Sequence, residues 1–379
     1  MKKNKALAAI GAMAAGVAAW AGPAAADPVT GPGWDGGGHA VFVQTNDPSG
    51  NQVVAYQRDE YGRLHLAGRY STGGNGTVIP GAVVDALASQ GSLAYDAAEH
   101  ELVAVNGGSD TITAFRVDGT HLSFARTVAS GGSTPVSVAI TGDRVYVLNA
   151  GGTGSVQGFF ADTLIPIPGT SRGLGLDPTA TPRFLNTPGQ IGLTPDGRHL
   201  VVTTKANGST IDVFGVSPFG TLSATPVVTP SATPVPFGFT FDSAGDLVTT
   251  EALTSHLTTY LIHPDGTLSP LGTVSNGQAA LCWVTSARGY FYGANAGSNT
   301  LTAYAEAAGG QPSVVGTTAT DPGPIDLAAT PDGSTLYVET GGNDLVDAFA
   351  VHGDGSLSLL GSVAPELPGH SGLEGIAVS

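Results

Sequence analysis

Eleven polar residues stand where apolar strand-like runs begin or end, and together they could do acid–base chemistry. Glu251 is the candidate base, because a carboxylate can activate a water molecule. Lys205 and Asn149 are the candidate donors for the oxyanion that forms when a carbonyl is attacked. We expect these three to be catalytic and the others to bind. The full set is Gln44, Asn106, Ser137, Asn149, Gln190, Lys205, Glu251, Asn295, Asp326, Glu339 and Glu374.

Two other interpretations of this set stay open. Lys205 and Glu251 could form a structural ion pair instead of a catalytic one. The acids Asp326, Glu339, Glu374 and Glu251 could instead hold a hard cation such as Ca²⁺, which prefers several oxygen ligands. No contiguous calcium-loop motif supports that second interpretation. We therefore expect no required cofactor, with a divalent cation as the alternative.

Two of the nine histidines are candidates for a functional role. His256 follows the Glu251 turn and is expected to bind near the same place, and His370 precedes the last strand-like run. The remaining seven stand at strand ends or in turns, where surface or structural roles are expected: His39, His65, His100, His121, His199, His263 and His352. Metal-binding His-Glu-x-x-His and phosphate-binding loops of the G-x-x-x-x-G-K-[ST] type are absent.

The elements that must position these residues form an internal repeat. Each copy is an apolar strand, a polar turn and an alternating strand that ends in an aromatic residue. The seven aromatics are Tyr56, Phe115, Phe159, Phe214, Tyr260, Tyr304 and Phe349, at intervals of 59, 44, 55, 46, 44 and 45 residues. A period in the mid-forties with four strands per unit predicts an all-β, seven-bladed β-propeller of four-stranded antiparallel blades.

Turns and closure fit the same fold. Asp-Gly pairs such as Asp196-Gly197 and Asp265-Gly266 stand between strand-like runs, where a tight turn needs positive φ. The first copy lacks its first strand, and 375–378 at the C-terminus fits that pattern. We therefore expect the C-terminal strand to close the ring and protect its edges. Two insertions, near 71–90 and 162–182, are predicted to be either functional loops or Gly/Pro/Thr padding.

Composition excludes several classes of protein. The 379 residues include 56 Gly and 25 Pro, only 12% are charged and 41% are hydrophobic. This composition argues against a disordered chain and against long helices. The single cysteine, Cys282, cannot form an internal disulfide, and its apolar setting predicts a buried inert thiol.

The N-terminus predicts export. Three lysines, an Ala-rich apolar run and Ala24-Ala25-Ala26 match a signal peptide over 1–26, followed by a flexible segment over 27–37 and the propeller over 38–379. Of the 14 basic side chains three lie in this leader, so 11 remain against 30 acids, a formal charge of −19. Nucleic acid and membrane surfaces are poor partners for such a chain. We expect a secreted monomer that acts on a small molecule, such as a carboxylate, or binds an extracellular ligand.

The repeat phrases also carry a family resemblance. The run from Leu193 to Val202 has the pattern L-x-P-D-G-x-x-L-x-V, and D-G-x-L recurs at 265–268. With seven blades these phrases resemble the lactonase-type β-propellers, which include bacterial 6-phosphogluconolactonases and fungal carboxymuconate-lactonising enzymes. The resemblance covers about residues 38–379. It implies a site at one mouth of the central channel that binds small lactones through His, Arg and Glu.

The family's catalytic positions are not matched here. The starts of innermost strands read Thr134-Pro135, Thr187-Pro188 and Gly323-Pro324, without His or Arg. A phosphorylated sugar lactone is disfavoured, because its dianion needs Arg or Lys. Two hypotheses follow: a lactonase-like enzyme that hydrolyses or forms a small lactone at the polar mouth, and a non-catalytic extracellular binding or scaffold propeller.

Overall fold

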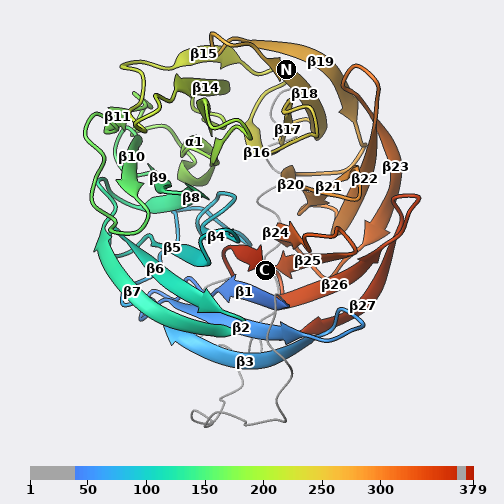
Figure 1. The fold of residues 1–379 in the computed structure, drawn as a ribbon. Helices are drawn as coiled ribbons and strands as arrows, with labels where there is room; N and C mark the ends of the chain where they lie inside the picture. Colours follow the sequence, from blue (N-terminus) through green and yellow to red (C-terminus); the bar gives the residue numbers. More distant parts are fainter. Residues whose placement is uncertain (1–38, 365–372) are drawn as a thin grey trace.

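A computed structural model describes residues 39–364 and 373–379, and these form the predicted ring of seven four-stranded antiparallel sheets. Figure 1 shows the sheets arranged in a ring about a central axis, with strands such as β4, β8 and β24 innermost and β3, β7, β23 and β27 at the rim. The predicted leader, the segment 27–37 and His370 lie outside the described residues.

The first four blades follow one another along the chain. Blade 1 consists of β28 (Ile376–Val378), β1 (Ala40–Gln44), β2 (Gln52–Arg58) and β3 (Leu64–Ser71). Blade 2 consists of β4 (Leu93–Asp96), β5 (Glu101–Asn106), β6 (Thr111–Asp118) and β7 (His121–Ala129). Blade 3 consists of β8 (Pro135–Thr141), β9 (Arg144–Asn149), β10 (Ser155–Phe160) and β11 (Arg172–Gly173). Blade 4 consists of β12 (Ile191–Leu193), β13 (His199–Thr203), β14 (Thr210–Gly215) and β15 (Val227–Pro230), and the short helix α1 (Arg183–Asn186) precedes it.

The last three blades complete the ring. Blade 5 consists of β16 (Pro236–Phe241), β17 (Leu247–Glu251), β18 (His256–Ile262) and β19 (Leu268–Ser275). Blade 6 consists of β20 (Leu281–Ala287), β21 (Tyr290–Asn295), β22 (Thr300–Ala307) and β23 (Gln311–Ala319). Blade 7 consists of β24 (Pro324–Ala329), β25 (Thr335–Thr340), β26 (Leu345–Val351) and β27 (Leu357–Val363).

Each copy of the sequence repeat falls at the same position within its blade. Each of the seven repeat aromatics lies on the third strand of its blade and pairs with an apolar residue in the first two positions of the second strand, as Phe115 does with Leu102 and Tyr304 with Phe291. None of the seven is more than 1% exposed. The Asp-Gly pairs form the predicted turns, and Gly197 and Gly266 have φ of 67° and 85°, which glycine adopts without a Cβ clash.

The ring closes through the C-terminal strand, as predicted. β28 pairs antiparallel with β1, in the register Phe42 with Ala377 and Val43 with Ile376. Gln44 N–H also donates to the carbonyl of Gly375. In Figure 1 the C-terminus lies at the centre, beside β1. Among the described residues no helix is sufficiently long and apolar to cross a bilayer.

The closing strand β28 has only three residues, so a substitution in it should lower the stability of the fold measurably. Ile376 is 5% exposed and packs among Val41, Val43 and Leu373. We expect Ile376→Ala to lower the free energy of unfolding by about 2–5 kcal/mol, because it removes buried methyl groups from β28, the strand that closes the ring against β1. Urea unfolding measures the loss. The matched control is Ile165→Ala, because Ile165 is 58% exposed, and an equal loss in both variants would contradict the closing role.

Candidate functional site at the channel mouth

The first insertion fills the mouth of the central channel. Residues 82–91, here called the channel segment, form hydrogen bonds with residues near the starts of five innermost strands. The Ser89 hydroxyl donates to the carbonyl of Val136, and the Trp283 indole N–H donates to the carbonyl of Ser89 at 2.8 Å. The Gln90 side chain bonds both the N–H and the carbonyl of Val284. This part of the first insertion is therefore held against the innermost strands by hydrogen bonds.

Lys205 fastens this segment to blade 4. Its ammonium donates to the carbonyls of Ala88 and Phe184 and to the Thr187 hydroxyl, and it lies 5.1 Å from the centre of the Phe237 ring. The side chain is 0% exposed. Burial lowers the pKa of Lys205 to about 7, and the Asp85 carboxylate opposes that shift. With three protein acceptors, this ammonium links the channel segment to α1 and leaves no N–H for a substrate.

Four buried carboxyl groups share the channel with Lys205. Asp326 accepts the N–H of Gly91 at 3.0 Å, Glu339 accepts the N–H of Gly375 at 3.0 Å, and Glu374 accepts the N–H of Leu87 at 2.8 Å. The fourth, Asp85, belongs to the channel segment and shares a hydrogen bond with Glu374. Asp326 and Glu374 therefore hold the segment through its backbone N–H groups, and Glu339 holds the residue before the closing strand. Burial raises the pKa of each of the four acids.

The predicted catalytic trio does not meet. Glu251 is buried in its own blade, where it accepts hydrogen bonds from the hydroxyls of Thr233, Thr258 and Tyr260. Asn149 donates to the carbonyl of Ser130 in blade 3. No ion pair joins Lys205 to Glu251 in the part of the chain that the structure describes. The trio thus shares no hydrogen-bond partner, and each member anchors a different connection.

Several predicted binding residues also hold the scaffold together. Asn106 and Asn295 cap the turn into the third strand of their blades through threonine hydroxyls, as Glu251 does. Gln190 bridges to both backbone groups of Phe239, and the Ser137 hydroxyl donates to the carbonyl of Gln90. Asp326, Glu339 and Glu374 meet in the channel as described above. Gln44 is 0% exposed in blade 1. Its side-chain amide has no hydrogen-bond partner among the described residues.

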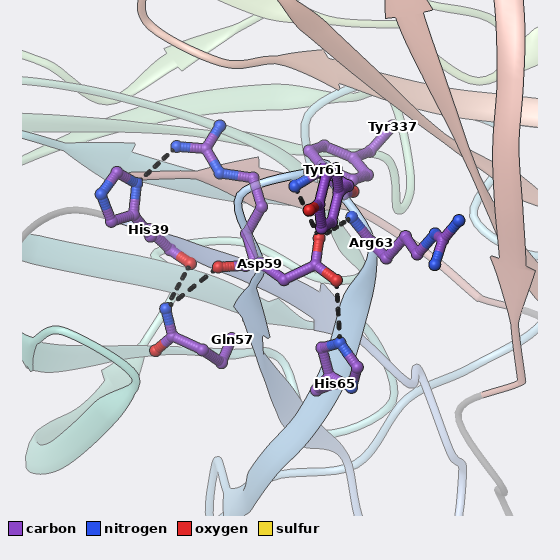
Figure 2. Close-up of polar contacts among 9 residues, drawn as sticks. His39, Gln57, Asp59, Tyr61, Arg63, His65 and Tyr337 are labelled. Atoms are coloured by element: carbon purple, nitrogen blue, oxygen red, sulfur yellow. Dashed lines mark hydrogen bonds and ion pairs between the residues drawn. The ribbon is translucent and has the colours of Figure 1, made fainter. Parts of the chain in front are cut away.

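Three of the described histidines, His39, His65 and His256, make local contacts at strand ends and turns. His256 is half-buried at the start of β18 and contacts the Thr254 hydroxyl. Figure 2 shows His39 and His65 at the β2–β3 hairpin, where the His65 ring lies 3.2 Å from the Asp59 carboxylate on the surface. The Tyr337 hydroxyl closes the same turn by donating to the carbonyl of Gly62. These contacts fit the surface roles that the sequence predicts for His39 and His65.

The calcium interpretation needs Glu251 beside the other acids. Glu251 instead faces three hydroxyls of its own blade. Within residues 39–364 and 373–379 no group of three or more His, Cys, Asp and Glu side chains is arranged to hold a metal ion. Cys282 is buried as predicted, and burial raises the pKa of its thiol, which keeps it protonated.

An apolar cavity of about 170 Å³ opens beside the channel segment, and we call it the mouth pocket. Its walls come from the channel segment, α1, and the strand starts and turns of blades 5 and 6. The lining residues are Ala82, Val83, Val84, Asp85, Ala88, Phe184, Leu185, Ala206, Val235, Phe237, Ala252, Leu253, Ala280, Cys282, Trp283, Ala296 and Gly297. Asp85 is the only acid among them, and no Lys, Arg or His lines the pocket.

The size and chemistry of this pocket restrict its ligands. An apolar cavity of about 150 Å³ in another protein holds benzene, so the mouth pocket fits one six-membered ring.

A second hollow, a groove of about 1170 Å³, lies elsewhere on the ring. It is lined by surface turns such as 195–198 and 242–246 and is open to solvent. The mouth pocket is the better candidate because it adjoins the channel and contains a buried ionisable group.

Sequence analysis missed the residues that build this pocket. Asp85, Phe184 and Trp283 lie outside the repeat phrase. Asp85 lies in the first insertion, near 71–90, and Phe184 directly follows the second, near 162–182. The two irregular intervals, 59 and 55 residues, were the available signal.

Comparisons with solved structures find the same fold. A protein from Lactobacillus plantarum aligns at 22% identity over 89% of this chain and 98% of its own, with a TM-score of 0.70. The periplasmic gluconolactonase PpgL of Pseudomonas aeruginosa aligns at 19% identity over 90% and 99%, with a TM-score of 0.70. A candidate 6-phosphogluconolactonase from Bacteroides fragilis aligns at 16% over 89% and 98%, with a TM-score of 0.69. These identities show a shared fold, and the predicted likeness to lactonase-type propellers holds at that level.

Neither the protein-family models nor the curated proteins contain a match to this chain.

The buried acids predict an unusual dependence of stability on pH. Burial raises the pKa of Asp85 to about 6 and of Asp326 to about 7, so the folded chain holds protons that the unfolded chain releases above about pH 4. This contribution to stability is complete below pH 4 and is lost as the pH rises through 6 and 7. We expect a higher urea midpoint at pH 5 than at pH 7.5.

The variant Asp326→Asn tests the cause. It removes one titrating group, so the difference between the urea midpoints at pH 5 and pH 7.5 should shrink. Asp265→Asn is the control, because Asp265 lies in an exposed turn and hydrogen bonds lower its pKa. A wild-type midpoint that rises from pH 5 to pH 7.5 would contradict the assignment.

Proposed function

We propose that this protein is an exported lactonase-like hydrolase that acts on a small, uncharged, mostly apolar lactone in the mouth pocket. The observation that carries the proposal is a ring-sized apolar cavity with one buried carboxyl group in its wall. Hydrolysis of a lactone needs a base that activates water, and a carboxyl group in an apolar wall is suited to that role at neutral pH. The lactonases among the structural neighbours add support at the level of fold.

The pocket lining narrows the substrate class. Phosphorylated sugar lactones carry a dianion that needs Arg or Lys, and neither residue type lines the pocket. Polyhydroxylated sugar lactones would leave hydroxyls unpaired against Val84, Val235 and Leu253, which costs binding energy for each hydroxyl. A compact ring such as δ-valerolactone meets neither objection. We further propose that the chain acts as a monomer, without nucleic acid or membrane partners.

A second candidate is ligand binding without turnover. The observation in its favour is that Lys205, Glu251 and Asn149 are occupied by protein contacts. Ligand binding that is saturable but unaccompanied by acid release in a pH-stat would favour this candidate.

The same pH-stat assay is repeated with a chelator added. We expect no effect of chelator, because the proposed base is a carboxylate, and a loss of rate would instead favour a metal held by the channel acids.

Filling the pocket should abolish function. Ala296 is half-buried at the pocket wall, so Ala296→Phe places a ring where the ligand would lie. We expect at least a tenfold loss in kcat/KM for δ-valerolactone, and a similar loss of affinity measured by Trp283 fluorescence in a Trp34→Phe background. Ala98→Phe, in an exposed turn of blade 2, is the matched control. Equal activity in both variants would place the site elsewhere.

Export makes a separate prediction. The leader ends in Ala24-Ala25-Ala26, so the mature chain should begin at Asp27. Mass spectrometry of the protein recovered outside the cytoplasm should show this N-terminus. A chain that keeps Met1 or residues 2–26, or that stays in the cytoplasm, would refute the export proposal without affecting the site.

A further inference from the structure

Two carboxyl groups meet at the wall of the mouth pocket. Asp85 lines the pocket with 7% of its surface exposed, and Glu374 lies behind it with 2% exposed. Their side chains share a hydrogen bond. Glu374 is fixed in turn, because its Oε1 accepts the N–H of Leu87 and its carbonyl accepts the Ser92 hydroxyl. The pair joins the channel segment to the chain two residues before the closing strand.

Two carboxyl groups that share a hydrogen bond in a buried site hold one proton between them at neutral pH. The proton belongs mainly to Glu374, because burial and the Asp85 charge raise the pKa of Glu374 well above its usual range. The pKa of Asp85 is raised only to about 6, mainly by burial. Glu374 therefore donates the shared hydrogen bond and Asp85 carries the negative charge.

Other charged and titratable groups act on this pair. The Lys205 ammonium favours the ionised form of Asp85, while the like charges of other acids in the channel disfavour it. The groups whose charges couple to Asp85 are Lys205, Cys282, Asp326, Glu339 and Glu374. Of these, only Cys282 shares the pocket wall with Asp85. The ionised group that faces a bound ligand is therefore Asp85.

We propose that Asp85 is the catalytic base of the mouth pocket and that Glu374 is its positioning residue. This inference rests on the proposed function, because it assigns residues to lactone hydrolysis in that pocket. It also gives a role to the first insertion, since the base comes from the channel segment and not from a blade.

The step balances with water as the only co-reactant. The Asp85 carboxylate takes one proton from water as the water oxygen bonds to the lactone carbonyl carbon. The ring C–O bond then breaks, and the leaving alkoxide receives that proton from Asp85. The product is a hydroxy acid, which releases its carboxylic proton to solvent above its own pKa. Asp85 ends ionised and Glu374 keeps its proton throughout.

The experiment measures hydrolysis of δ-valerolactone by the mature chain between pH 4.5 and 8.5. We expect the wild-type kcat to rise with pH through about 6 and then level off, because the base must be ionised. Asp85→Asn should lower kcat by about 10²–10⁴-fold. Asp212→Asn is the matched control, since Asp212 is a buried aspartate of blade 4 that lies outside the pocket lining. Its kcat should equal that of the wild type.

Glu374 is tested by two variants that a merely structural role would not separate. Glu374→Met removes the hydrogen bond to the ionised Asp85, so the acidic limb of the profile should move to higher pH by about one unit. Glu374→Gln keeps an N–H donor and should restore the limb to near the wild-type position. Identical limbs in the two variants would overturn the positioning role, and this comparison remains decisive if Asp85→Asn does not fold.

The outcomes separate this inference from the function on which it rests. If the wild type hydrolyses the lactone and Asp85→Asn does so equally fast, the inference fails and the proposed function stands. If the wild type releases no acid from δ-valerolactone or from an aryl lactone, the proposed hydrolysis fails, and the assignment of Asp85 fails with it.

Discussion

The burial of Lys205 is the interaction on which the channel mouth depends. An unpaired ammonium in an apolar interior is costly, so it persists only with hydrogen-bond acceptors and a nearby negative charge. Here the acceptors come from the channel segment, α1 and Thr187, and the charge comes from Asp85. One side chain thus joins the channel segment and α1 to blade 4. Without it, the channel segment would lose its hydrogen-bonded link to α1 and Thr187.

The acids of the channel follow from the same constraint. Asp326, Glu339 and Glu374 satisfy backbone N–H groups that the channel segment and the closing strand bring inside the ring. Burial raises their pKa, so the channel need not hold four negative charges beside one lysine. The polarity of the mouth is therefore mostly structural. The exception is Asp85, which faces the only apolar hollow that adjoins the channel in the described chain.

The fold was predictable because its signal is repeated seven times. Each blade carries an aromatic such as Phe115 at the same register position, and local turn chemistry at pairs such as Asp265-Gly266 agrees with it. The candidate site was not predictable in the same way. Strand ends show which residues lie near the channel, but not where their side chains point, and Glu251 turns toward Thr258 and Tyr260 of its own blade. The base proposed here lies in an insertion, where no repeat fixes the conformation.

The most direct test of this account is a crystal structure of the mature chain soaked with a small uncharged lactone or its hydroxy-acid product. The account predicts density for one ring in the mouth pocket, against Trp283 and Leu253, with an oxygen atom within hydrogen-bond distance of Asp85. An empty mouth pocket with the ligand bound elsewhere on the ring, or a channel segment that lies outside the channel, would contradict it.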